Sequence, residues 1–197
     1  MVGVVSPEAL EAMRRVIGID PGLAGGIGVL DLGTDGGREA FLYRVPILEY
    51  KKAGRKKREY DLPKMRALLV NEARAFSQVM VGIEAQNPHP EEGVVSAMRL
   101  GLGVGFWQGL LAGLELPYEV VYPIVWKKHH GLLRQPKAMS QVLVGRLFPR
   151  FAQTRKVDEG ACEALLIAVY VASHAGWLGA TPRFEPPGEE QQGAFQL

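Results

Sequence analysis

Residues 15–31 read RVIGIDPGLAGGIGVLD, a stretch in which two apolar runs flank a turn. The proline and glycines of 21–26 are typical of a hairpin connection, so we predict strands at 15–20 and 27–31. Asp20 ends the first run, where a carboxylate is costly to bury unless it is paired or bound to a cation. This hairpin and its acid are the starting point for interpreting the rest of the chain.

Two further acids stand at the ends of apolar runs far along the chain. Glu84 follows the apolar run 79–83, and Glu163 precedes the apolar run 164–168. Three carboxylates on rigid elements suggest one converging site for a hard divalent metal ion, which suits metal-assisted phosphodiester hydrolysis. Each acid also has an ordinary explanation: a turn-capping aspartate for Asp20, a solvent-facing strand end for Glu84 and a polar helix position for Glu163.

The rest of the chain predicts an α/β protein built on a mixed sheet. Further strands are expected at 40–47, 79–84 and 118–122. Helical periodicity predicts helices at 61–76, 96–114, 136–148 and 158–174. Two segments without a period are predicted to be loops, 50–59 and 85–94. We divide the chain into a lead at 1–14, one domain at 15–179 and a flexible tail at 180–197.

Composition places the chain among globular proteins with a single core. Of its 197 residues 47% are hydrophobic and 22% are charged, which is ordinary for one such domain. The single cysteine, Cys162, cannot form an internal disulfide, and its apolar neighbours predict a buried side chain rather than a reactive thiol. We find neither a secretory signal nor an uncharged apolar stretch of about 18 residues, so we expect a cytoplasmic protein without a membrane partner.

Positive charge gathers in one short segment. Between Tyr50 and Tyr60 six basic residues stand against one acid, Glu59, for a local charge of +5; they are Lys51, Lys52, Arg55, Lys56, Lys57 and Arg58. The segment is either a run of charges exposed to solvent or a segment that binds the DNA backbone. We predict the second, because each phosphate contact releases counterions.

The predicted helix at 96–114 contains five glycines, although glycine costs up to about 1 kcal/mol per site inside a helix. Four of them keep a four-residue spacing: Gly101, Gly105, Gly109 and Gly113. This spacing produces a smooth stripe for close packing of another backbone. The packing partner is either the sheet of the same chain or a second copy of the protein.

Five motifs in order resemble the RuvC family of Holliday-junction resolvases, in the ribonuclease H-like superfamily, and especially its shorter phage-type members. They are the first acidic strand with its hairpin, the second acidic strand, the glycine-rich helix, a strand with basic residues after it and the last acidic helix, at 17–29, 84, 96–109, 117–128 and 159–168. The resemblance implies a ribonuclease H-like mixed β-sheet of about five strands with helices on both faces.

The resemblance also implies a function. It implies a Mg²⁺-dependent crossover junction endodeoxyribonuclease that resolves four-way DNA junctions by paired, symmetric cuts in recombination and repair. Such an enzyme acts as a homodimer, in the cytoplasm of a bacterium or a phage-infected host cell, with interface positions at Gly101, Gly105 and Gly109. It uses two Mg²⁺ ions per active site, for which Mn²⁺ is expected to substitute, and no small-molecule cofactor.

By motif position, the resemblance assigns metal binding and catalysis to Asp20, Glu84 and Glu163. The family has a fourth ligand three or four residues before the last acid, and Gly160 cannot ligate. We therefore assign this ligand to Glu159, which shares a helix face with Glu163, and keep Asp158 as the alternative. Both acids have a second explanation, since acids at a helix N-terminus are favoured by the helix dipole.

Basic residues after the last predicted strand resemble functional lysines of the family. The resemblance assigns catalytic and DNA-contacting roles to Lys127 and Lys137 and a DNA contact to Lys128; the alternative is a solvated basic loop. Some family members insert an aromatic residue of the loop after the second acid into the junction. That loop has no aromatic residue here, so His89 is our candidate for stacking on a base.

Three other functions compete with junction resolution. The first is a related nuclease that acts on flaps, branched DNA or RNA–DNA hybrids, which the same acids would serve. The second is a junction-binding protein without catalysis, in which the acids are structural. The third is a sugar-kinase-like or actin-like ATPase, against which the short chain and the sequence around Glu84 both argue.

Overall fold

The computed structural model describes residues 13–33, 36–88, 91, 93–152 and 158–184. Its strands are β1 (Arg14–Ile19), β2 (Gly26–Leu32), β3 (Arg38–Arg44), β4 (Ile47–Lys52), β5 (Arg55–Tyr60), β6 (Gln78–Glu84) and β7 (Tyr118–Val121). Its helices are α2 (Leu62–Ala73), α3 (Val94–Gly113), α4 (Pro123–His129), α5 (Met139–Leu147), the 3₁₀ turn η1 (Pro149–Phe151) and α6 (Glu159–His174). The predicted lead at 1–14 and tail at 180–197 fall largely outside the described residues.

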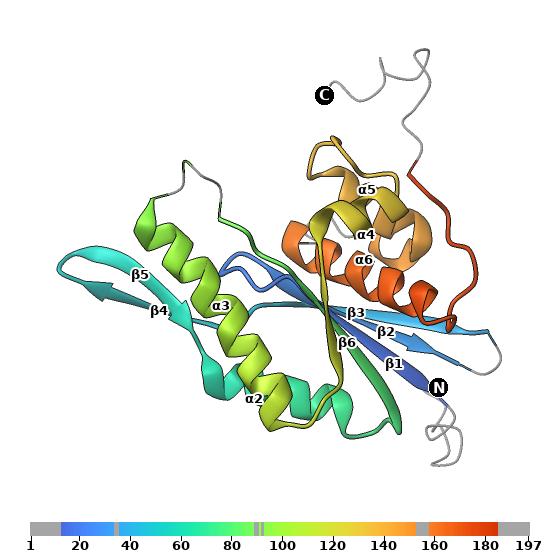
Figure 1. Cartoon of the computed structure of the whole chain (residues 1–197), viewed down its shortest axis with the longest axis horizontal. Coiled ribbons are helices and arrows are strands. Elements are labelled where there is room, and N and C mark those ends of the chain that lie inside the picture. The colour runs from blue at the N-terminus through green and yellow to red at the C-terminus, as the bar shows by residue number, and fades with distance from the viewer. Residues whose placement is uncertain (1–12, 34–35, 89–90, 92, 153–157, 185–197) are drawn as a thin grey trace.

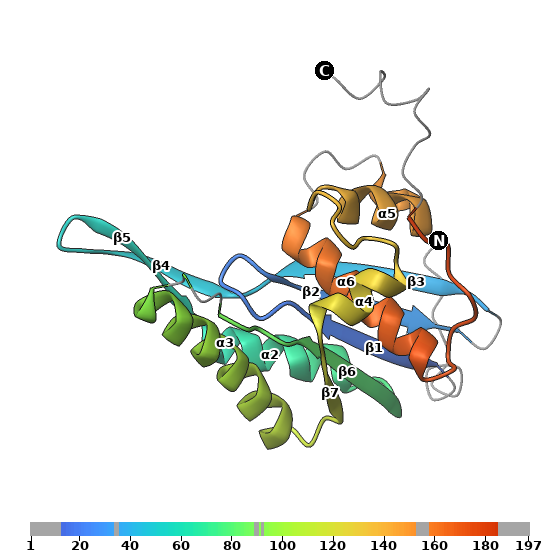
Figure 2. The same cartoon turned by 45° about the horizontal axis from the view of Figure 1, so that its top comes forward.

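The main sheet has five strands in the order β3-β2-β1-β6-β7. Strand β1 runs antiparallel to β2 and parallel to β6, and β7 runs parallel to β6. The sheet is therefore mixed and has the predicted number of strands. In Figures 1 and 2 β1 lies in the middle of the sheet, so the acid that follows it stands at the centre of one sheet edge.

Helices cover both faces of this sheet, because side chains alternate along its strands. On β1, Val16 joins a core with α5 and α6, whereas Ile17 and Ile19 join a core with α2 and α3. Figures 1 and 2 show α6 with α4 and α5 on one side of the sheet and α2 with α3 on the other. The predicted α/β fold is thus confirmed.

Glycines let α6 lie directly on strands β1 and β2. A Cβ atom on Gly28 would come within 2.2 Å of Leu165 Cα, and one on Gly26 within 2.3 Å of Ala161 Cα. A Cβ atom on Gly18 would meet the backbone of α6 as well. Only glycine fits at such distances, and the contact brings the first turns of α6 over the hairpin that carries Asp20.

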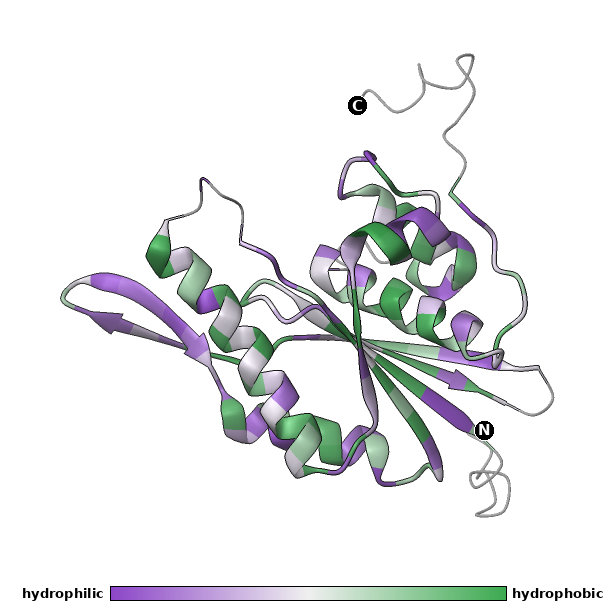
Figure 3. Ribbon diagram, viewed as in Figure 1, coloured by the Kyte–Doolittle hydropathy of each residue, from purple (hydrophilic) through white to green (hydrophobic). Residues whose placement is uncertain are grey.

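The predicted loop at 50–59 is wrong, because β4 and β5 form an antiparallel hairpin there. Its turn is at Ala53 and Gly54, which have positive φ angles of 50° and 74°, as expected of the primed turns of tight hairpins. Most side chains of the hairpin are exposed, so no apolar alternation marks the strands in the sequence. Figures 1 and 3 show the hairpin as a hydrophilic ribbon that extends beyond the main sheet.

Helix α4 was not predicted from the sequence. It has only seven residues, and Pro123 in its first turn looked like the end of the preceding strand. Its consequence is local but important, since Trp126, Lys127 and Lys128 lie on a helix rather than in a loop. Successive side chains therefore point in different directions around its axis.

Within the described ranges, α3 is the one helix long and apolar enough to cross a membrane by length and composition alone. Trp107 and Leu111 on one side of it are buried in the core beneath the sheet. Val94, Val95, Met98 and Leu102 are exposed, and Arg99 lies between them. The absence of a membrane partner stays a prediction.

Candidate active site

Asp20 follows the last residue of β1 and begins the turn to β2. Its backbone N–H donates to the carbonyl oxygen of Gly26 at 3.0 Å, which closes the turn. Its carboxylate oxygen Oδ1 accepts from the backbone N–H of Gly22 at 3.3 Å. A Cβ atom on Gly25 would lie only 2.8 Å from the Asp20 Cγ atom, so the turn wraps closely around the carboxyl group. The turn-capping explanation of Asp20 is therefore correct, and the residue also lines a cavity.

Glu84 ends β6, the parallel neighbour of β1, so the two acids lie at the same edge of the sheet. Its side chain is buried and both oxygens accept hydrogen bonds. Trp126 Nε1 donates to Oε1 at 2.9 Å, and Gln86 Nε2 donates to Oε2 at 2.8 Å. The same Gln86 amide lies 3.5 Å from Asp20 Oδ1 and so links the two carboxylates. The solvent-facing explanation of Glu84 is wrong, because the sheet edge is covered there by α4.

Glu163 lies one turn into α6 and is also buried. Its alternative explanation, a polar position on an amphipathic helix, did not require burial. Lys127 Nζ lies 3.4 Å from Glu163 Oε1. The three acids line one cavity of about 370 Å³ together with Gln86, Lys127 and Lys137. Asp20, Glu84, Glu163, Lys127 and Lys137, all chosen from the sequence, are therefore brought together from five separate places in the chain.

Burial and mutual repulsion raise the pKa values of two acids in this cavity, Asp20 and Glu84. Burial raises the pKa of Asp20 to about 6, and the nearby Glu163 adds to the rise. Burial likewise raises the pKa of Glu84 to about 7, and the charges of Asp20 and Glu163 contribute. Lys127 opposes both shifts, and Lys137 opposes that of Asp20. Carboxyl groups held together against their repulsion are typical of a functional site.

The fold is supported by similarity to solved structures, whereas comparison of the sequence finds no match. No protein family matches the sequence, and no curated protein matches it. Among solved structures, Thermus thermophilus RuvC matches with a TM-score of 0.55 at 17% identity, over 83% of this chain and 97% of that one. The same protein in complex with a Holliday junction substrate matches with a TM-score of 0.52 at 15% identity, over 83% and 98%.

The chain has a RuvC-like fold. Yeast mitochondrial Ydc2, a Holliday junction resolvase, also matches, with a TM-score of 0.46 at 13% identity over 83% of this chain and 77% of that one. At these identities the comparison concerns the path of the backbone. It agrees with the fold expected from the five motifs and does not extend to the roles of individual side chains.

Two acids expected in the site of this RuvC-like fold lie outside the cavity. Glu159 is exposed, and its side chain is not among those that line the cavity. Asp158 caps the N-terminus of α6 by accepting from the Gly160 N–H at 3.1 Å, and it pairs with Arg44 at 3.0 Å. The helix-terminus explanation therefore holds for Asp158. The assignment of a fourth metal ligand stays a prediction.

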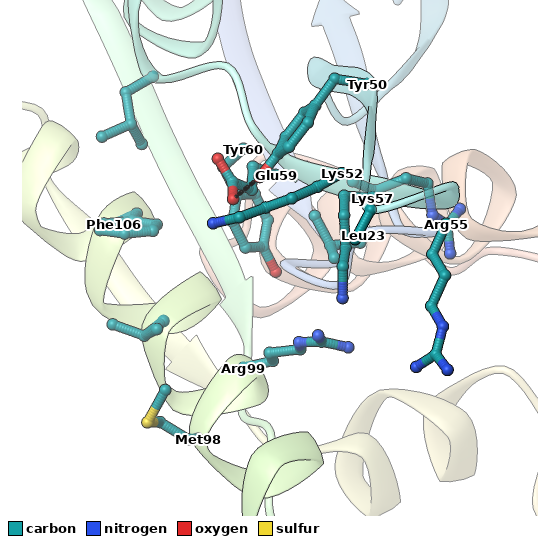
Figure 4. A pocket seen from close by; sticks show the side chains of 14 residues that line it. Leu23, Tyr50, Lys52, Arg55, Lys57, Glu59, Tyr60, Met98, Arg99 and Phe106 are labelled. Carbon is teal, nitrogen blue, oxygen red and sulfur yellow. Dashed lines mark hydrogen bonds between the residues drawn. The ribbon is translucent and has the colours of Figure 1, made fainter.

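The remaining DNA-contact predictions occupy several places. Lys128 faces a different hollow from Lys127, one lined by Tyr170 and Arg183. His89 lies outside the described residues. The six basic residues of the predicted loop stand on the β4–β5 hairpin, and none of them forms an ion pair within the described part of the chain. Figure 4 shows how several of them face a second, larger cavity beside α3.

The chemistry of the three acids fits a hard divalent cation such as Mg²⁺. Carboxylate oxygens are its preferred ligands, and a cation would relieve the repulsion that raises the pKa values of Asp20 and Glu84. In the arrangement described, no three acids, histidines or cysteines of residues 13–33, 36–88, 91, 93–152 and 158–184 form a ready-made metal cluster. Glu84 and Glu163 are held instead by Trp126, Gln86 and Lys127, so a bound ion would have to compete for their oxygens.

Sequence reasoning missed Trp126 and Gln86 as site residues. Gln86 had a usable signal, since it stands two positions after Glu84 and can share its side of an extended chain. Trp126 had none, because it is 42 residues from Glu84 and its helix was not predicted. Only the packing of α4 against the end of β6 brings the indole to the acid.

Proposed function

We propose that the protein is a divalent-metal-dependent endonuclease that cuts four-way DNA junctions. One observation carries the proposal: Asp20, Glu84 and Glu163 converge with Lys127 and Lys137 in one cavity at the edge of a RuvC-like sheet. Known structures with this fold include one that contains a Holliday junction substrate. The charge pattern supports the proposal, because acids for a metal are flanked by cations for phosphate.

The residues of the cavity divide the work of hydrolysis. Metal ions held by Asp20, Glu84 and Glu163 would supply an activated water and stabilise the leaving oxygen; we expect two Mg²⁺, replaceable by Mn²⁺. Lys127 and Lys137 line the same cavity and would hold the phosphate by charge. Trp126 and Gln86 fix the orientation of Glu84 through their hydrogen bonds. No nucleophilic side chain is needed, because water attacks the phosphorus.

We further propose that the protein works as a homodimer through α3. Gly101, Gly105 and Gly109 are exposed, and a Cβ atom on any of them would meet nothing within 4 Å in the described structure. The stripe therefore does not pack against its own sheet, which was the alternative explanation of its spacing. A two-fold symmetric dimer would present two cavities to the two equivalent strands of a junction.

The test is cleavage of a mobile four-way junction, a linear duplex, a flap and an RNA–DNA hybrid, with Mg²⁺ or with EDTA. The wild-type protein and Asp20→Asn are compared, with binding measured alongside. We expect paired, symmetric nicks in the junction alone, only with the metal, and their loss in the variant while binding persists.

Two other results would replace the proposal. Faster cutting of flaps or of the hybrid would assign the cavity to a related nuclease of the same fold. Tight junction binding without cutting under Mg²⁺ or Mn²⁺ would show a binding protein whose acids are structural.

A further inference from the structure

A second cavity lies between the β4–β5 hairpin and α3, and we call it the hairpin groove. Its volume is about 900 Å³, within the range of about 300–1,000 Å³ typical of ligand pockets. The hairpin lines one side and the part of α3 from Met98 to Phe106 the other, as Figure 4 shows. Among the side chains that line the groove are Tyr50, Lys52, Lys57, Tyr60, Arg99 and Phe106.

Basic side chains dominate the polar lining of the hairpin groove. Five cations line it against one acid, Glu59, which leaves a charge of +4; they are Lys52, Arg55, Lys57, Arg58 and Arg99. None of the five has an ion pair among the described residues. So much like charge in one concave surface favours a polyanionic occupant.

Alternation along its two strands places the cations of the hairpin on two faces. Lys52 pairs with Arg55 and Tyr50 with Lys57, and since cross-strand partners share a face, these four side chains point together into the groove. Lys51 pairs with Lys56 on the opposite face, and neither lines the groove; Arg58 belongs to that face by its pairing with Glu49 but still lines the groove. Like charges opposite each other weaken a hairpin, and an anionic chain on the groove face would offset that repulsion.

Aromatic rings form the apolar part of the groove. Tyr60 and Phe106 pack edge to face with ring centroids 5.6 Å apart, one from the end of β5 and the other from α3. Met98 and Leu102 extend this surface along the helix and are exposed. A cationic rim beside aromatic rings is how proteins bind nucleic acid whose bases are free to stack.

The hairpin groove is physically joined to the acidic cavity. Tyr60 Oη donates to the carbonyl oxygen of Pro21 at 3.0 Å, next to Asp20 in sequence. Leu23 of the same turn lines the groove, whereas Gly22 and Ala24 on either side of it line the acidic cavity. A strand that leaves the acidic cavity across this turn therefore enters the groove.

We propose that the hairpin groove binds unpaired DNA next to the cut site, with bases against Phe106 and Tyr60 and phosphates on the groove-face cations. The inference rests on the proposed endonuclease function and adds the strand state that the enzyme recognises. Paired bases keep their faces stacked inside a duplex, so only an unpaired segment, as at the centre of an open junction, can use these rings.

Binding of short DNA by the full-length Asp20→Asn protein tests the groove without cleavage. The probes are a fluorescent dT oligomer of about 10 nucleotides and a duplex of equal length, each titrated at several salt concentrations. We expect the single strand to bind more tightly than the duplex. Lys52→Gln with Lys57→Gln should lower the slope of log affinity against log salt by about 1.4, or about 0.7 per lost phosphate contact.

Matched variants separate the groove from general charge and general packing. Lys51→Gln with Lys56→Gln removes the same charge from the opposite face of the same hairpin and should change the slope by less than half as much. Phe106→Leu should weaken single-strand binding about fivefold or more, because stacking is lost while an apolar side chain remains. Tyr118→Leu, an exposed ring on β7 outside the groove, should have no effect.

Three results would overturn the groove proposal. They are equal slopes for the two lysine pairs, equal binding of duplex and single strand, and a Phe106→Leu variant that changes only the dimer mass in sedimentation. The last would mean that a second copy of the chain covers the groove. Intact junction cutting with any of them would reject the groove alone, whereas groove-dependent binding without junction cutting would reject the endonuclease instead.

Discussion

The indole N–H of Trp126 donates a hydrogen bond of 2.9 Å to Oε1 of Glu84, although 42 positions separate the two residues in sequence. Trp126 is completely buried, so the donor is held in place by the core. The bond also favours the charged form of a carboxyl group whose pKa burial raises to about 7. Trp126 is therefore a positioning residue for one of the three acids of the cavity.

Trp126→Phe should slow junction cleavage about 10- to 100-fold, the usual effect of losing a partner of a metal ligand. The expected loss is in kcat, with junction affinity unchanged, because the ring touches Glu84 rather than DNA. Trp107→Phe is the control: Trp107 is equally buried, and its Nε1 has no acceptor among the described residues. Equal losses in the two variants would mean that only packing is at stake.

Glu163→Gln should lower cleavage by about 100-fold or more, on the scale of a lost electrostatic contact to the transition state. Glu159→Gln removes the same charge one turn earlier on α6, from an exposed side chain outside the cavity, and should cost less than tenfold, about 1.4 kcal/mol. Single-turnover cleavage rates at saturating Mg²⁺ distinguish them. A loss at Glu159 as large as at Glu163 would establish Glu159 as the fourth ligand.

Gly105→Leu should convert the proposed dimer into a monomer. The substitution improves helix propensity by up to about 1 kcal/mol but places a large side chain in the middle of the stripe. Arg66→Leu, an exposed position on α2, is the control for added apolar surface. Sedimentation gives the mass, and the two nicks in a junction should become independent of each other. A Gly105→Leu protein that is still dimeric would exclude the stripe as the contact.

Gly28→Ala should destabilise the protein by about 1–3 kcal/mol and reduce cleavage, because the new Cβ atom meets Leu165 Cα at 2.2 Å. Relief of the clash requires α6 to move away from β2, and Glu163 moves with it. Gly179→Ala, where nothing lies within 4 Å, should leave the free energy of unfolding unchanged. Urea denaturation measures both. Unchanged stability in Gly28→Ala would contradict the close packing of α6 on the sheet.

His130 should make the protein less stable in mild acid. It is completely buried, Nε2 bonds to the Leu166 carbonyl oxygen at 2.8 Å, and burial lowers its pKa from 6.5 to about 4. As the pH falls, the imidazole of His130 is protonated in the unfolded chain before it is protonated in the folded protein. The stability that the neutral, buried imidazole contributes is therefore present above about pH 6.5 and is lost as the pH falls toward 4.

Between pH 7 and pH 5 this loss amounts to about 2 kcal/mol, at about 1.4 kcal/mol per pKa unit. His130→Gln keeps a donor for Leu166 but does not titrate, so its unfolding free energy should fall by less over that interval. The comparison also removes the opposite contributions of Asp20 and Glu84, whose raised pKa values stabilise the fold in acid. Parallel pH profiles for the two proteins would contradict the assignment to His130.

Much of the fold could be predicted from local sequence patterns, because those patterns reflect local physics. The apolar runs before Asp20 and Glu84 predicted two central strands, and the periodic segment before His174 predicted the last helix. The three acids were identifiable for the same reason, since each interrupts or borders a buried element. Strands β4 and β5 are exposed on both faces, so their sequence has no alternation of apolar and polar residues, and the hairpin was not predicted.

By itself, the sequence determined which residues are buried and which acids are costly to bury, since both follow from the free energy of transfer out of water. Only the tertiary structure decided which side chains meet. Trp126 reaches Glu84 because α4 packs over the sheet edge, and Lys52 faces a cavity because the β4–β5 hairpin lies beside α3. Such contacts depend on the relative positions of distant elements, which arise from packing of the whole chain and leave no mark at the spacing of neighbouring residues.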